Sequence, residues 1–304
     1  MNGSGQPLLR TDVAFASPLD LTASLAPLGR AGDDLIDRFD GTRALRTLRL
    51  SQTEEVVAYT AEVTDRADSP ALAVHIDPVH ADRLDEITAA VRGSLLTDRS
   101  ALATLAAADK PAARLAARYP GLVPVLFRDP FTALIRSISA QQVNLRWAAT
   151  VRARLATRYG TRHQVGQWEV WSLHPQPLAE ARLEDLRELQ LTTAKSRSVI
   201  EVARAAQAGE LGLQQLEAMG DEELIAHLAG LRGIGRWSGE WFLARTLGRP
   251  RVVAGDLGVR KAIGRLYGTP AMPSEIEVRR LTEHWGAAAT HAQALALHDL
   301  ATRP

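Results

Sequence analysis

A short stretch in the C-terminal third of the chain carries the residues best suited to chemistry. Gly233 and Gly235 flank a single isoleucine and lie between two segments with helical periodicity. Glycines allow the backbone to reverse tightly, while Ile234 anchors the turn inward. The free N–H groups of the turn and of the following helix would favour an anion such as phosphate. Arg232 and Arg236 add positive charge to this turn.

The spacing of two glycines alone fits an ordinary corner between helices with a glycine cap. The fuller pattern, leucine at 231, G-I-G at 233–235 and an aromatic residue at 237, is more specific. Together with its two amphipathic helices over about 221–248, it is typical of a helix-hairpin-helix, a clamp on the DNA backbone that does not depend on base sequence.

Asp256 is the candidate catalytic carboxylate. It follows a short apolar run and begins a predicted helix, where aspartate is also a common N-cap. Residues 231–270 hold eight basic and two acidic residues, and these surroundings are expected to keep the carboxylate ionised. Asp256 lies 21 residues after Gly235, so the chain can return it to the hairpin.

Trp237 and Trp241 are spaced i,i+4 and share one face of the helix that leaves the hairpin. Such a stripe is often part of a core. Beside a DNA-contacting turn it fits a stacking pocket equally well, and an indole attracts a cationic base by roughly 0.5–2 kcal/mol. The remaining tryptophans are predicted as core: Trp147, Trp168, Trp171 and Trp285.

The composition limits the class of protein. The chain has 304 residues, enough for two domains, and contains no cysteine, which excludes disulfides, thiolate zinc sites and cysteine-held iron–sulfur clusters. We expect no transmembrane helix, no signal peptide and a cytoplasmic protein, associated with the nucleoid when bound to DNA. The net charge of +1 is the sum of −4 over residues 1–120 and +5 over residues 121–304. Within the second part, residues 231–270 alone carry +6. A local basic surface fits phosphate contact, although a solvated helical face would give the same count.

The hydrophobic pattern changes character near residue 95. Strands are predicted over 45–50, 56–63 and 71–76, with helices over 21–28 and 79–92. Helical periodicity dominates afterwards, which predicts a small α+β domain over 1–95 and an all-helical region over 96–304. Its predicted helices cover 99–108, 111–118, 130–140, 143–159, 178–189, 194–208, 221–230, 235–248, 257–267, 274–284 and 288–300.

These segments resemble a known family. The runs LRGIGRWSGEW and VVAGDLGVRKAIGRLYG are similar to the helix-hairpin-helix DNA glycosylases, and most similar to the DNA-3-methyladenine glycosylase II (AlkA) type. DPFTALIRSISAQQV at 129–143, LQLTTAKSRSV at 189–199 and PLDL at 18–21 resemble further segments of that family. The resemblance covers nearly the whole chain and is strongest over 120–270. It implies an α+β N-terminal domain followed by a mostly α-helical helix-hairpin-helix DNA glycosylase fold.

The resemblance also implies roles for single residues. Asp256 takes the position of the catalytic aspartate, and Trp237 and Trp241 take those of base-pocket aromatics. Gly233 and Gly235 are the hairpin glycines that bind DNA. Gln142 occupies the position of the residue that enters the duplex as a wedge. The family's hairpin often holds Na⁺ or Mg²⁺ by main-chain carbonyls, here those of Ala229, Leu231 and Ile234, and no other cofactor is implied.

One position separates the subfamilies. Bifunctional members carry a lysine after G-x-G-x as an amine nucleophile, and this chain has Trp237 there. The resemblance therefore implies a glycosylase without lyase activity, and the lack of cysteine separates the chain from the branches that carry an iron–sulfur cluster. Three positions depart from the family: a polar Gln142 at the wedge, and Ala288 and Leu21 where the family has tryptophan. Two missing aromatic walls would open the pocket and change the substrate range.

The number of candidate acids bears on the substrate. A base within a duplex must be flipped out before an enzyme can reach it. A base alkylated at a ring nitrogen is already cationic and leaves without a proton, so one carboxylate, Asp256, suffices to stabilise the oxocarbenium-like sugar. The expected function is a monomeric, monofunctional glycosylase that removes 3-methyladenine- or 7-methylguanine-type bases from double-stranded DNA. The alternatives are a glycosylase for another lesion such as hypoxanthine, a non-catalytic helix-hairpin-helix DNA-binding protein, or a helical scaffold that binds no DNA.

Overall fold

The structure is a computed structural model that describes residues 9–50, 55–64, 69–77 and 81–303. The first two residues of the helix predicted over 79–92 lie outside these ranges. Its remainder forms a 3₁₀ turn, η1 (Ala81–Arg83), and helix α3 (Leu84–Gly93). No helix within the described ranges is long and apolar enough to cross a membrane.

The N-terminal part contains an antiparallel five-stranded sheet with the strand order β1-β5-β4-β3-β2. The three predicted strands are confirmed, but the two edge strands were not predicted. The helix predicted over 21–28 is split into two short helices at Ala26. The elements are β1 (Leu9–Ala14), α1 (Leu21–Leu25), α2 (Pro27–Arg30), β2 (Arg38–Phe39), β3 (Arg43–Arg49), β4 (Val56–Thr64) and β5 (Ala71–Asp77).

The rest of the described chain is mostly helical, as predicted. The helix predicted over 178–189 is divided into two short helices by residues 180–182, and the helix α11 was not predicted. The helix that leaves the hairpin ends in a π-helical turn. The helices are α4 (Ser100–Ala108), α5 (Lys110–Arg118), α6 (Pro130–Ala140), α7 (Leu145–Tyr159), α8 (Pro175–Ala179), α9 (Leu183–Glu188), α10 (Thr193–Gln207), α11 (Leu213–Ala218), α12 (Asp221–Ala229), α13 (Arg236–Phe242), η2 (Leu243–Leu247, the π turn), α14 (Leu257–Tyr267), α15 (Glu275–Thr282), η3 (Glu283–Ala288) and α16 (Ala289–Thr302).

A β-hairpin corrects the prediction that residues 96–304 are all-helical. Strands β6 (Gly160–Val165) and β7 (Trp168–Leu173) pair around Gly166, whose φ is +59°. Val165 and Val170 bury their side chains together with Leu45 and Ala58 of the N-terminal sheet. The alternation of polar and apolar residues around Gly166 is a hairpin signal that the helical interpretation of this region overlooked.

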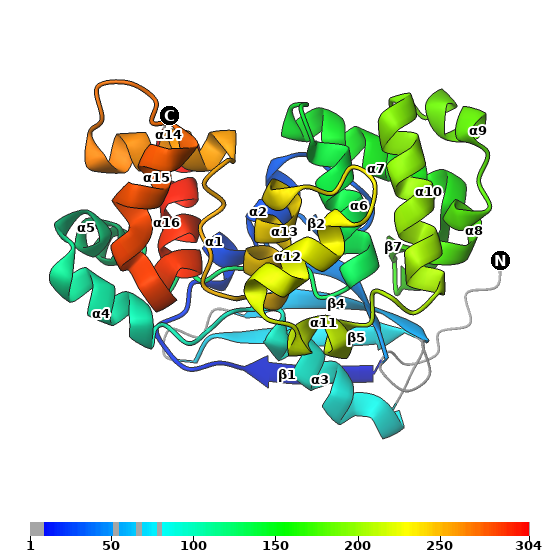
Figure 1. The fold of residues 1–304 in the computed structure, drawn as a ribbon. Helices are drawn as coiled ribbons and strands as arrows, with labels where there is room; N and C mark the ends of the chain where they lie inside the picture. The colour runs from blue at the N-terminus through cyan, green and yellow to red at the C-terminus, as the bar shows by residue number, and fades with distance from the viewer. Residues whose placement is uncertain (1–8, 51–54, 65–68, 78–80, 304) are drawn as a thin grey trace.

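Two large hydrophobic clusters among the described residues support the fold, beside the small one under the β-hairpin. The first joins the sheet to the central helices and includes Val74, Ile138 and Leu243, and the second joins α4, α5, α14 and α16. In Figure 1 the sheet lies beneath α6, α12 and α13, while α14, α15 and α16 gather with α4 and α5 at the left. Trp241 packs against both clusters, so the helix α13 lies at their junction. The domain boundary near residue 95 stays a prediction.

A buried ionic cluster links the loop before β2 to α6 and α7. The Asp34 carboxylate contacts Arg136 at 2.9 Å and Arg152 at 2.8 Å, and Asp37 contacts Arg46 at 2.6 Å and Arg136 at 2.5 Å. Burial raises the pKa of the Asp37 carboxyl, but Arg46 and Arg136 outweigh burial and lower that pKa overall. Removing one partner from such a cluster leaves charge uncompensated in the interior.

The substitution Asp34→Asn is therefore expected to lower the free energy of unfolding by about 3–5 kcal/mol, measured by urea denaturation. Its control is Asp33→Asn, which removes an exposed ion pair to Arg38 and should cost less than about 1 kcal/mol. Equal effects of the two substitutions would contradict a structural role of the buried cluster.

Candidate functional site

The two hairpin glycines have different structural roles. Gly233 has φ +75°, and a Cβ placed on it would lie 2.2 Å from Oγ of Ser198 on α10. Gly235 has an extended backbone with φ −116°, and a Cβ there would meet no atom within 4 Å. Ile234 is 5% exposed and anchors the turn, as predicted. Gly233 is thus needed for packing against α10, whereas Gly235 borders open space.

The turn after α6 is held against the hairpin. Gln141 Nε2 donates a hydrogen bond of 2.7 Å to the Gly233 carbonyl. Lys195 Nζ donates to the carbonyls of Ser139 at 3.1 Å and Gln141 at 2.7 Å. The next residue, Gln142, is exposed and has φ +55°. These bonds hold the turn that carries Gln142, the predicted wedge, against the hairpin.

Asp256 returns to the helix that leaves the hairpin, as the spacing predicted. Its Oδ1 accepts a hydrogen bond of 2.9 Å from the Val259 N–H and caps α14. Its Oδ2 accepts a hydrogen bond of 3.3 Å from Trp237 Nε1. The carboxylate is half-buried. Asp256 is therefore both a helix cap and the partner of a predicted base-pocket residue.

The charge of the site differs from the prediction. Arg232 and Arg236 are not free cations, because each pairs with an acid from outside residues 231–270: Glu201 at 3.6 Å and Glu222 at 3.0 Å. The hydrogen bond from Arg236 lowers the pKa of the Glu222 carboxyl. Among the described residues, no ion pair reaches Asp256. A count within one window of sequence overstated the positive charge because the folded chain brings carboxylates from other helices.

The aromatic residues divide into two groups. Trp237 contacts Asp256, whereas the Trp241 ring stacks on Phe127 with centroids 5.8 Å apart and so joins the core. Trp285 is 2% exposed and is core, as predicted. The prediction for Trp147 is wrong, because 37% of this residue is exposed near the start of α7. It lies on the first turn after the exposed wedge segment, where no hydrophobic cluster reaches it.

Several residues at the site were missed by the sequence analysis. Gln141 and Lys195 hold the wedge turn, but nothing in their spacing predicts contacts between segments 54 and 92 residues apart. Leu145 is 63% exposed and follows Gln142 closely, so it supplies apolar surface beside the polar wedge. The two positions that depart from the family, Leu21 and Ala288, are each 1% exposed.

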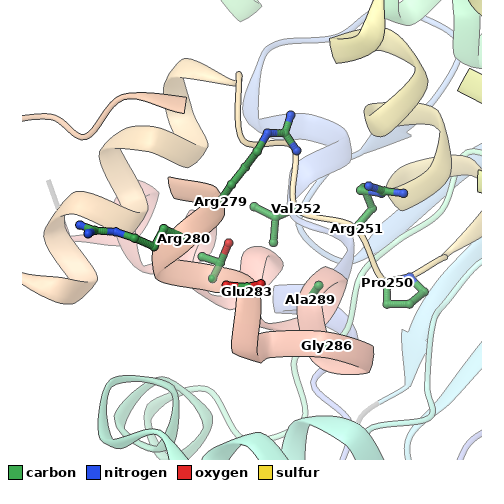
Figure 2. A pocket seen from close by; sticks show the side chains of 9 residues that line it. Pro250, Arg251, Val252, Arg279, Arg280, Glu283, Gly286 and Ala289 are labelled. Carbon is green, nitrogen blue, oxygen red and sulfur yellow. The ribbon is translucent and has the colours of Figure 1, made fainter. Parts of the chain in front are cut away.

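An open cavity of about 400 Å³ lies beside the segment that leads to Asp256. Figure 2 shows it between the loop at Pro250–Val252 and the residues of α15 and η3. Arg279, on α15, pairs with Glu240 at 2.8 Å and with Glu275 at 2.6 Å. None of the predicted site residues lines this cavity, which is therefore a neighbour of the site rather than the base pocket itself.

The sequence was compared with protein families and with known proteins. The family model described as HhH-GPD superfamily base excision DNA repair protein matches residues 135–287. The chain is 32% identical over 176 residues to DNA-3-methyladenine glycosylase 2 of Escherichia coli K12, covering 57% of each protein. It spans less than three-fifths of the length of the first bacterial relatives that it matches, 58% and 57%.

Solved structures share the fold over nearly the whole chain. The 3-methyladenine DNA-glycosylase of Archaeoglobus fulgidus superposes with a TM-score of 0.80 at 22% identity, covering 96% of this chain and 98% of that one. An 8-oxoguanine glycosylase/lyase of Clostridium acetobutylicum in complex with DNA superposes with a TM-score of 0.70 at 16% identity, covering 96% and 97%. At these identities the likeness establishes the fold alone, and it confirms the α+β part followed by a mostly helical part.

The two glycines give a matched test of the hairpin geometry. Gly233→Ala should lower the free energy of unfolding by about 1–3 kcal/mol, because the new Cβ meets Ser198 and the backbone is left-handed. Gly235→Ala should leave stability within about 0.5 kcal/mol of the unsubstituted protein. Adding Ser198→Ala to Gly233→Ala should restore part of the loss in urea denaturation. Equal losses for the two glycine substitutions would show that the hairpin packs differently.

Proposed function

The chain belongs to the HhH-GPD superfamily of base excision DNA repair proteins, and on that premise we propose that it is a DNA glycosylase. The observation that carries the proposal is the contact between the Asp256 carboxylate and the Trp237 indole beside the hairpin. A DNA clamp alone would need the hairpin, but it would not need a carboxylate aimed at an aromatic side chain. This contact favours the enzyme over a non-catalytic helix-hairpin-helix protein.

The proposed substrate is a purine alkylated at a ring nitrogen, such as 3-methyladenine or 7-methylguanine, in double-stranded DNA. Such a base is cationic and leaves as a neutral molecule, so the reaction needs stabilisation of the developing positive charge on the sugar. Asp256 supplies this negative charge. The bond between the base nitrogen and the anomeric carbon breaks with its electron pair on the base, water adds to that carbon, and the proton of the water passes to solvent. The indole of Trp237 attracts the cationic base before it leaves. The relatives named 3-methyladenine glycosylases support this choice of substrate.

The surface proposed to bind DNA combines two neighbouring turns. Gly235 leaves space in front of the start of α13, where a backbone phosphate can approach the N–H groups. Gln142 is proposed to enter the gap left by the flipped base, and the exposed Leu145 adds apolar surface to that wedge. The protein is proposed to act as a monomer, since this surface and Asp256 come from one chain.

We propose that the enzyme has no lyase activity. The position after the G-x-G-x pattern is Trp237, so no amine is available there to attack the sugar. Lys195 lies near the hairpin, but its ammonium group is engaged by the Ser139 and Gln141 carbonyls. The rival proposal is a glycosylase that removes another base, such as hypoxanthine or 8-oxoguanine. One structural neighbour is named an 8-oxoguanine glycosylase/lyase.

The main-chain carbonyl oxygens of the hairpin are suitable ligands for a structural cation. Main-chain carbonyl oxygens are hard ligands of the kind that Na⁺ and Mg²⁺ accept. The Leu231 carbonyl accepts a hydrogen bond of 3.1 Å from the Ile234 N–H, which leaves one of its lone pairs for an ion. The carbonyls of Ala229, Leu231 and Ile234 are the proposed ligands, and a bound ion would brace the turn beside the DNA backbone.

Asp256→Asn is the decisive substitution. Asparagine is also a good N-cap, so the fold and duplex binding should be retained. Loss of the negative charge should lower the rate of base release by at least about 100-fold. The measurement is chromatography of the bases released from methylated DNA, with DNA binding measured in parallel. Asp20→Asn, at the N-cap of α1, is the matched control and should release bases normally. Near-normal release by Asp256→Asn would overturn the assignment.

The substrate and the absence of strand cleavage can be tested in one reaction. Duplexes that contain one 7-methylguanine, hypoxanthine or 8-oxoguanine are incubated with the unsubstituted protein, followed by borohydride or by alkali. We expect release from the 7-methylguanine duplex only, strand breaks only after alkali, and no covalent complex after borohydride. A trapped complex would contradict the proposal of hydrolysis without lyase activity, and preferred release of another base would contradict the alkylated-base substrate.

A further inference from the structure

A smaller cavity of about 100 Å³ lies between α1 and α2, the loop at 122–125 and α16, and Asp256 is not among its lining residues. Its charged or titratable lining residues are Arg30, Arg245 and His298, and the remaining lining residues are apolar apart from Ser24. No carboxylate lines it. One water needs only about 10–15 Å³ of such space, so the cavity has room for a polyatomic ligand.

Arg245 is the central group of this cavity. It lies in the π turn η2, and its carbonyl accepts a hydrogen bond of 2.8 Å from the Phe127 N–H. Its guanidinium lies 5.5 Å from the centre of the Phe127 ring. Within the described ranges, this guanidinium has neither a hydrogen bond nor an ion pair. Burial, followed by repulsion from Arg136, Arg46 and Arg30, lowers the pKa of Arg245 to about 10.

The interior around Phe127 carries more positive than negative charge. Arg136 and Arg46 also lie against this ring, at 4.3 and 5.7 Å from its centre. The carboxylates of the ionic cluster, Asp34 and Asp37, are already engaged by Arg46, Arg136 and Arg152. With Arg245, four guanidinium groups face two carboxylates. The Arg245 guanidinium is half-buried and has no acid partner among the described residues, which is costly, so this arrangement favours the uptake of a negative group.

The geometry of the cavity also provides an entrance and a second set of donors. Arg30 is exposed, and its Nη2 lies 3.4 Å from His298 Nδ1. Burial and then Arg30 lower the pKa of His298, against the carboxylates of Asp20 and Asp299, and a ring nitrogen that carries a proton can donate one hydrogen bond. We propose that Arg245, Arg30 and His298 bind one small oxyanion of the inorganic phosphate or sulfate type in this cavity.

An oxyanion here would pair with Arg245 by charge-assisted hydrogen bonds and offset the repulsion between the arginines around Phe127. Trp241 stacks on the same Phe127 ring. A bound anion should therefore stabilise the fold and the packing of α13 through Trp241. The anion would not contact Asp256, the proposed catalytic residue. The site does not depend on the proposed glycosylase activity.

The test is titration of the complete protein with sodium phosphate, with sodium chloride at equal ionic strength as the reference. Calorimetry should show one phosphate bound per chain, and the melting temperature should rise and then saturate with phosphate concentration. A duplex oligonucleotide should not displace this phosphate. Displacement would assign the binding to the DNA surface and overturn the proposal, as would a melting temperature that follows ionic strength alone.

Two substitutions locate the site. Arg245→Met keeps a long apolar stem over Phe127 and removes the charge, so phosphate affinity should fall at least about tenfold. Arg30→Gln, at the exposed entrance, tests the same site without a change in the interior and should weaken binding severalfold. The control Arg162→Gln, on the exposed hairpin strand β6, should bind phosphate normally. Unchanged affinity in Arg30→Gln, or in a folded Arg245→Met, would overturn the proposal.

Discussion

The close approach of the hairpin to α10 places the hairpin and the wedge turn relative to each other. At Gly233 a hydrogen atom takes the place of a side chain, so the backbone lies directly against Ser198. This approach brings the Gly233 carbonyl within reach of Gln141, and Lys195 on the same helix α10 holds the Gln141 carbonyl. Ser137 and Ser238 add a buried hydrogen bond of 2.8 Å between α6 and α13. The hairpin, the wedge turn and the helix that carries Trp237 are thus joined by direct hydrogen bonds.

The arginines are compensated by carboxylates on the surface but not fully in the interior. On the surface, acids from α10 and α12 pair with the arginines of the hairpin, so the net positive charge of that segment is spread over ion pairs. Such exposed pairs exchange partners at little cost, so in the proposed complex with DNA the phosphates would replace the carboxylates. In the interior, arginines meet too few carboxylates, and water cannot make up the difference cheaply. Phosphate groups are therefore the proposed ligands both on the surface and in the interior of this chain, for different physical reasons.

Local patterns explain what could be predicted from the sequence. Glycine positions, capping residues and helical periodicity are local, so the hairpin, the cap at Asp256 and most helices were correct. The hairpin at 160–173 was missed because a helical reading of the flanking segments dominated a short alternating pattern. Contacts such as Gln141 with Gly233, and ion pairs such as Arg236 with Glu222, join distant segments. No spacing rule within one segment contains them, because they depend on how the helices pack.

The structural and catalytic interpretations of Asp256 are compatible, because its two oxygens have different partners. Oδ1 accepts the Val259 N–H and begins α14, and this bond sets the rotation of the carboxylate. The same rotation turns Oδ2 toward Trp237. A cap whose second oxygen faced solvent would need only an acceptor, and serine or asparagine would serve as well. A carboxylate whose second oxygen is aimed by its own cap at an aromatic side chain is already oriented before any substrate arrives, and catalysis by a fixed charge needs this preorganisation.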